Sequence, residues 1–238
     1  MGNKFVKGLK KDSRFGKVLA VNFNPYKVCN FNCIYCGVGP TTDKTIERKE
    51  FYPPEMIFEE ISNYIDRNGE PNYIWVVGNG EPTLYSSFGK LCNLIRRMYP
   101  NVKIAISTNA SLFYREDVRE EFSFLDLVLI ELVSVSHQEF SEICRQHEDI
   151  KINHLLEGIK LFREIFKGEM ILVSVFLEGI NDNQKNLDGI KNLLLELKPS
   201  AYILKNYACR GYKSLDGEFK KIVQNTFNDL PCEVIYKF

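Results

Sequence analysis

Short apolar runs alternate with segments of helical periodicity along almost the whole of this 238-residue chain. Six of the runs are rich in Val, Ile and aromatic residues and are bounded by Gly, Pro or Asn, which is typical of strands buried on both faces. They are residues 18–23, 73–78, 102–108, 125–132, 170–177 and 201–207. A strand followed by a crossover helix leads to a parallel neighbouring strand, so the alternation predicts a parallel sheet whose strands all point the same way.

Apolar residues at helical spacing predict crossover helices between several of these strands. The stripes are Ile57, Phe58, Ile61, Tyr64 and Ile65; Phe88, Leu91, Cys92, Ile95 and Met98; Leu155, Ile159, Phe162 and Phe166; and Leu187, Ile190, Leu194 and Leu197. After a helix over 215–223, residues 232–238 can add a seventh strand. Six or seven units are too few for a full eight-unit barrel, which leaves a partial barrel or a doubly wound sheet.

Charge and composition exclude some classes of protein. The 31 Lys and Arg balance the 31 Asp and Glu, so no global basic field favours nucleic acid. No apolar stretch approaches the roughly 20 residues that a bilayer requires, and the N-terminus lacks the apolar region of a signal peptide. We therefore expect a cytoplasmic monomer with no membrane partner, folded as a single domain over 1–238 with 1–17 as an N-terminal extension.

Three of the seven cysteines are clustered in the C-x3-C-x2-C run CNFNCIYC, at Cys29, Cys33 and Cys36. Without a secretory signal, an odd number of cysteines favours metal or thiol chemistry over disulfides. Three thiolates can hold an inorganic core and leave one position without a protein ligand. A structural zinc site needs four ligands and no fourth is near in sequence, so a [4Fe–4S] cluster is favoured. A zinc-stabilised binding module is the alternative from another class.

Polar residues follow the predicted strands at the edge where parallel α/β proteins place their reactive groups. The first strand is followed by CNFNCIYCG, the second ends in GNGEPT, the third in STNAS, the fourth in IELVS and the sixth in NYACRG. The cysteine loop and these strand ends should therefore meet at one face of the sheet.

With Tyr35 before Cys36, the cysteine loop resembles the C-x3-C-x-aromatic-C pattern of the radical S-adenosylmethionine (SAM) superfamily. Together with TIERKEFYP, GNGEPTLY, STNAS and EGIND, it resembles the tRNA wyosine-synthase-like branch of these proteins. The resemblance implies a partial (β/α)6 TIM-like barrel and a [4Fe–4S] cluster on Cys29, Cys33 and Cys36. It also implies that the fourth iron binds SAM, and that one electron from a donor such as flavodoxin or ferredoxin yields methionine and a 5′-deoxyadenosyl radical.

The resemblance, together with the side-chain chemistry of the strand ends, predicts the SAM-binding residues. These are Tyr35 in the cysteine loop; Gly78, Asn79, Gly80, Glu81 and Pro82, which would receive the methionine ammonium; Ser107, Thr108 and Asn109, which would bind a carboxylate or ribose; and Glu131 and Ser174. Ordinary turns, helix caps and an internally bonded serine are the structural alternatives. Relatives more often carry a Ser-Leu-Asp-like signature where this chain has Glu131, Leu132 and Val133.

The substrate is not encoded in these motifs. The resemblance suggests a tRNA base, and Lys4, Lys7, Lys10, Lys11, Arg14 and Lys17 would supply a basic strip or a solvated tail. A radical activator or modifier of a protein or peptide is the runner-up, and a small molecule is the third class. Cys209, after the sixth strand, would be a hydrogen-atom donor or a substrate contact, unless it is a small buried hydrophobe.

Overall fold

The computed structural model describes residues 4–205 and 217–237, and its main element is an eight-stranded sheet in the order β1-β2-β5-β6-β7-β8-β9-β10. The strands are β1 (Val6–Asp12), β2 (Gly16–Val21), β5 (Tyr73–Val76), β6 (Lys103–Thr108), β7 (Leu127–Glu131), β8 (Glu169–Val175), β9 (Ala201–Lys205) and β10 (Glu233–Lys237). A second, two-stranded sheet pairs β3 (Val28–Cys29) with β4 (Asp43–Lys44).

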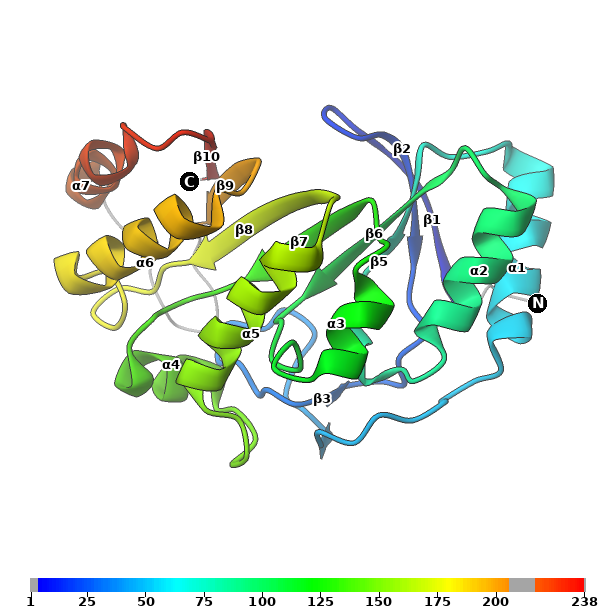
Figure 1. The fold of residues 1–238 in the computed structure, drawn as a ribbon, viewed down its shortest axis with the longest axis horizontal. Helices are drawn as coiled ribbons and strands as arrows, with labels where there is room; N and C mark the ends of the chain where they lie inside the picture. Colours follow the sequence, from blue (N-terminus) through cyan, green and yellow to red (C-terminus); the bar gives the residue numbers. More distant parts are fainter. Residues whose placement is uncertain (1–3, 206–216, 238) are drawn as a thin grey trace.

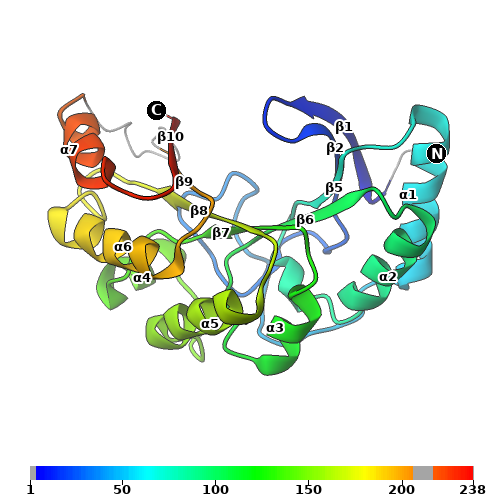
Figure 2. The ribbon, with the colours of Figure 1, turned by 45° about the horizontal axis from the view of Figure 1, so that its top comes forward.

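Helices cover the outer face of the curved main sheet, while its inner face looks toward the space between the β1–β2 hairpin and β10 (Figures 1 and 2). They are α1 (Pro54–Asn68), the short 3-10 helix η1 (Pro82–Leu84), α2 (Phe88–Met98), α3 (Glu116–Phe122), α4 (His137–Cys144), α5 (Ile152–Ile165), α6 (Gln184–Leu197) and α7 (Gly217–Phe227). In the described ranges, no helix is long and apolar enough to cross a bilayer.

The predicted partial barrel is confirmed. From β2 to β10 each strand pairs in parallel with the next strand of the main sheet, including the seventh C-terminal strand, which lies beside β9. The sheet does not close, because β1 and β10 form its two edges. The C-terminal ends of the parallel strands therefore lie along one rim, where sequence reasoning placed the reactive groups.

The expectation that all strands point the same way is wrong for the N-terminal segment. Val6–Asp12 forms β1, which pairs antiparallel with β2. Only Val6 of this strand is buried, so no apolar alternation marks it in the sequence. A side chain of α1 anchors its start instead, because the Glu60 carboxylate accepts hydrogen bonds at 2.7 Å from the backbone N–H groups of Phe5 and Val6.

Two short helices were also missed by the sequence pattern. Helix α3 has seven residues and buries Val118 and Phe122, and α4 has eight residues and buries Phe140, Ile143 and Cys144. Two or three apolar residues are too few to show a helical period, so helix length limited this part of the prediction.

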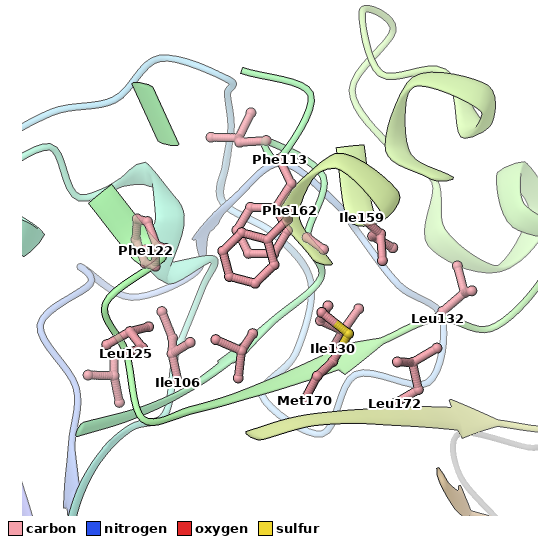
Figure 3. Close-up of a cluster of buried hydrophobic side chains, with 14 of the residues drawn as sticks. Ile106, Phe113, Phe122, Leu125, Ile130, Leu132, Ile159, Phe162, Met170 and Leu172 are labelled. Atoms are coloured by element: carbon pink, nitrogen blue, oxygen red, sulfur yellow. The ribbon is translucent and has the colours of Figure 1, made fainter. Parts of the chain in front are cut away.

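The main core lies between the sheet and its helices. Figure 3 shows side chains of β6, β7 and β8, such as Ile106, Ile130 and Leu172, beneath aromatic rings from α3 and α5. The rings of Phe113 and Phe162 stack with centroids 4.2 Å apart, a contact that adds about 0.5–1.5 kcal/mol to the burial of the two rings. This packing fixes the strands whose ends carry the site.

Candidate functional site

Most of the predicted site residues line one cavity of about 210 Å³ at the C-terminal rim of the sheet. The cavity is lined by these sequence-predicted residues: Cys29, Cys33, Tyr35, Cys36, Gly78, Asn79, Gly80, Glu81, Ser107, Thr108, Asn109 and Glu131. They come from the loop after β2 and from the ends of β5, β6 and β7. Residues spread over about 100 positions of the chain are thus brought together by the topology of the parallel sheet.

The cysteine loop is held against the last turn of α4 by its backbone. The N–H of Asn32 donates to the carbonyl of Cys144 at 2.9 Å, and that of Ile34 donates to the carbonyl of Ile143 at 2.9 Å. Cys29 lies in β3 and is buried, whereas Cys33 and Cys36 are half-buried. Burial, and secondarily the negative charge of Glu81, raises the pKa of the Cys29 thiol to about 12.

Glu81 organises the ends of β5 and β6 rather than facing an open cavity with free oxygens. Its Oε1 accepts hydrogen bonds from Thr83 N (3.0 Å), Thr83 Oγ1 (2.7 Å) and Thr108 Oγ1 (2.6 Å), and its Oε2 accepts one from Asn109 N (3.0 Å). The residue is only 2% exposed. Burial raises the pKa of this carboxyl, and the four donors oppose the rise by stabilising the charged form.

The glycines after β5 allow the strand end to touch the cysteine loop. A Cβ on Gly80 would stand 1.9 Å from the carbonyl oxygen of Val28, the residue before Cys29. Beside this contact, the N–H of Glu81 donates to the same Val28 oxygen at 3.1 Å, and the N–H of Lys27 donates to the Asn79 carbonyl at 2.7 Å. Only glycine fits at position 80, because any side chain would meet rigid backbone.

Asparagine and serine side chains tie the cysteine loop to the end of β6. Asn109 Nδ2 donates to Asn30 Oδ1 at 2.8 Å, and Asn30 Nδ2 donates to Ser111 Oγ at 2.6 Å. On the inner face of the sheet, Ser107 Oγ accepts a hydrogen bond from Trp75 Nε1 at 2.9 Å. Polar groups of the STNAS segment therefore fix the walls of the cavity as well as lining it.

Three predicted site residues are not part of the described cavity. Pro82 is the first residue of η1 and is buried beside Glu81 without lining the cavity. Ser174 is buried in β8 and donates to the carbonyl of Leu132 at 2.6 Å, which is the internally bonded alternative. Cys209 lies outside the described residues.

Sequence reasoning missed three charged or thiol-bearing residues that line the cavity, Lys27, Cys144 and Lys205, along with the apolar Phe31, Val38 and Leu129. Lys205 ends β9 and its Nζ lies 3.4 Å from Oε1 of Glu131, with both side chains roughly a third exposed. Cys144 ends α4, is buried and lines the same cavity as Cys33. Lys205 could have been found as a charged residue at a strand end, whereas the place of Cys144 depends on the docking of α4 and has no signal in the cysteine spacing.

The donor set fits a cluster with one open position. The three thiols of the cysteine loop line the same cavity, and the Gly80 contact holds that loop against the polar ends of β5 and β6. In the part of the chain that the structure describes, no three His, Cys, Asp or Glu side chains converge as they would on a single metal ion. The thiolates of a [4Fe–4S] cluster need no such convergence, since each binds a different iron.

Comparison with known proteins decides the family. A family model described as the radical SAM superfamily matches residues 23–188, which is more than half of the chain and includes the cysteine loop and the ends of β5, β6 and β7. The chain belongs to the radical SAM superfamily. The cofactors of this superfamily are a [4Fe–4S] cluster and SAM, and related structures have been solved with SAM and with the cluster bound.

Individual relatives show the breadth of the superfamily. The chain is 39% identical over 189 residues to a UPF0026 protein of Methanocaldococcus jannaschii, covering 79% of this chain and 58% of that protein. Its fold is similar to a radical SAM methyltransferase from Sphaerobacter thermophilus (TM-score 0.73, 14% identity, 96% of this chain and 68% of that one). It is also similar to TYW1 with a lysine–pyruvate adduct bound (TM-score 0.66, 18% identity, 89% and 73%). The two structural likenesses show the fold alone.

Proposed function

We propose that this radical SAM protein holds its cluster through Cys29, Cys33 and Cys36 and cleaves SAM reductively to start hydrogen abstraction from a substrate. The observation that carries this proposal is the meeting of the three thiols with the ends of β5 and β6 in one cavity. When bound, the cluster and SAM supply a one-electron cleavage that gives methionine and a 5′-deoxyadenosyl radical. The residues of the chain bind, orient and enclose these groups.

Each strand end has a distinct role in this proposal. The backbone around Gly78 and Gly80 receives the methionine end of SAM, because glycine allows close approach of a ligand to the main chain. Glu81 acts as a positioning residue, since its oxygens accept four hydrogen bonds from the chain itself. Glu131, half-buried at the end of β7, has a carboxylate that suits the ribose diol.

The test of the reaction class is the formation of 5′-deoxyadenosine. Protein reconstituted anaerobically with iron and sulfide should, after reduction with dithionite, convert SAM to 5′-deoxyadenosine and methionine, measured by liquid chromatography with mass spectrometry. Cys36→Ala protein treated in the same way is the control and should form neither. Tightly bound zinc without iron, together with no binding of SAM, would instead establish the zinc-stabilised module.

For the substrate we propose a tRNA base, and a peptide as the second class. The motif resemblance to wyosine-synthase-like proteins supports the first, as do Lys10 and Lys11, which are exposed on the β1–β2 hairpin. The strip is smaller than the sequence indicated, because Arg14 forms ion pairs at 2.6 Å with Glu169 and Glu233.

The two substrate classes can be distinguished by testing whether tRNA or peptide accelerates the cleavage of SAM. Unmodified tRNA and a peptide library are added in parallel to the reduced protein, and modified nucleosides or peptides are sought by mass spectrometry. Stimulation of 5′-deoxyadenosine formation by tRNA, with a mass change on one nucleoside, is the expected result. Stimulation by peptide alone would replace the first proposal by the second.

A further inference from the structure

The cavity is lined by a largely buried lysine that has no ion-pair partner among the described residues. Lys27 lines the cavity and is only 3% exposed, yet within the described ranges its ammonium has neither a hydrogen-bond acceptor nor an ion-pair partner. Lysine is almost never buried to this degree unless its charge is compensated. No carboxylate of the described residues forms an ion pair with this ammonium, so its charge is open to an anion bound in the cavity.

Among the described residues, neither carboxylate that lines the cavity forms an ion pair with Lys27. Glu81 accepts four hydrogen bonds from Thr83, Thr108 and Asn109. Glu131 faces the ammonium of Lys205 across 3.4 Å. Of the two lysines that line the described cavity, Lys205 has an ion-pair partner and Lys27 has none.

The backbone holds Lys27 firmly at this place. Its φ is +54°, a left-handed conformation that a lysine rarely adopts, and such strain is retained where the surroundings determine it. Its N–H donates to Asn79 at 2.7 Å and its carbonyl accepts from the N–H of Thr42 at 3.1 Å. The conformation places the residue between the cysteine loop and the end of β5, two positions before Cys29.

Lys27 and the three thiols of the cysteine loop line the same cavity, and Lys27 lies two positions before Cys29. A buried cation favours negative charge in its neighbourhood, because the low local dielectric screens the attraction weakly. Three thiolates around a cluster are the largest concentration of negative charge that this cavity would hold.

We infer that Lys27 is the countercharge of the thiolate-bound cluster and raises its reduction potential. The inference rests on the proposed function, since it requires the cluster on Cys29, Cys33 and Cys36. Reduction adds one negative charge to the cluster, and a buried ammonium nearby stabilises the reduced form more than the oxidised form. The residue thereby eases the entry of the electron on which cleavage of SAM depends.

The test is the midpoint potential of the cluster, measured without SAM by a redox titration followed by electron paramagnetic resonance. Lys27→Met should give a more negative midpoint potential than the wild type, and Lys27→Arg, which keeps the charge, should stay close to it. Lys49→Met is the matched control, because this lysine is exposed and pairs with Glu47 away from the cavity. It should leave the potential unchanged.

Each other outcome has a defined meaning. Loss of the cluster in folded Lys27→Met with recovery in Lys27→Arg supports the countercharge, whereas loss in both variants overturns it. An unchanged potential with weaker SAM binding in Lys27→Met overturns it as well and assigns the ammonium to the SAM carboxylate. If the wild-type protein assembles a cluster and cleaves SAM, an unchanged midpoint potential in Lys27→Met contradicts this inference and leaves the proposed function intact. If the wild-type protein assembles no cluster, the proposed function itself is contradicted.

Discussion

Gly80→Ala tests the contact that joins the end of β5 to the cysteine loop. The new Cβ would stand 1.9 Å from the carbonyl oxygen of Val28 and 2.9 Å from its carbon, so backbone must move. Such overpacking costs about 1–3 kcal/mol, and the hydrogen bond from Glu81 N to the same oxygen adds about 0.5–1.5 kcal/mol when it breaks. We expect the free energy of unfolding to fall by about 2–4 kcal/mol.

The assay is urea unfolding of the cluster-free protein followed by circular dichroism, with iron content of the reconstituted protein as a second readout. Gly37→Ala is the matched control, because this glycine follows Cys36 and a Cβ there meets nothing within 4 Å. It should change the unfolding free energy by less than about 0.5 kcal/mol. If Gly80→Ala were as stable as Gly37→Ala and bound as much iron, the close approach would not exist as described.

Three further predictions follow from the site. Thr108→Val removes a donor to buried Glu81 and should lower the unfolding free energy by about 1.5–3 kcal/mol, measured by urea denaturation; a loss below about 0.5 kcal/mol would contradict the network. Glu131→Ala should weaken SAM binding by about 1.5–3 kcal/mol in calorimetry without loss of iron, and unchanged affinity would remove Glu131 from the site. In cluster-free protein at pH 8, iodoacetamide should modify half-buried Cys36 before buried Cys29. The pKa of about 12 leaves roughly one Cys29 thiol in ten thousand as the reactive thiolate. Mass spectrometry after timed quenching measures the order, and modification of Cys29 first would refute the prediction.

The repeated strand and helix pattern was sufficient to predict the parallel sheet, because buried strands and long amphipathic helices each carry a clear period. β1 was not predicted because it is an edge strand with mainly exposed side chains. It is held by its backbone pairing with β2 and by hydrogen bonds from its start to the Glu60 carboxylate. Helices α3 and α4 were not predicted because they are too short for their apolar residues to show a helical period.

In the site as well, residues at strand ends were predictable from the sequence, whereas residues placed by tertiary contacts were not. The ends of β5 and β6 were predictable because strand direction alone brings them to one rim. The place of Cys144 beside the cysteine loop was not, since it depends on two backbone hydrogen bonds between α4 and that loop. Burial of Lys27 was equally invisible, because a lysine in PYKVC reads as an ordinary solvated turn residue.

The most direct test of the account is the iron content of single cysteine variants reconstituted anaerobically under identical conditions. Alanine at Cys29, Cys33 or Cys36 should each abolish the cluster, while Cys92→Ala, in the buried stripe of α2, should keep about four irons per chain. Cys144→Ala decides whether the neighbouring thiol belongs to the ligand set, and we expect it to keep the cluster. A full cluster in any of the first three variants, or its loss in Cys144→Ala with retention in Cys33→Ala, would contradict the account.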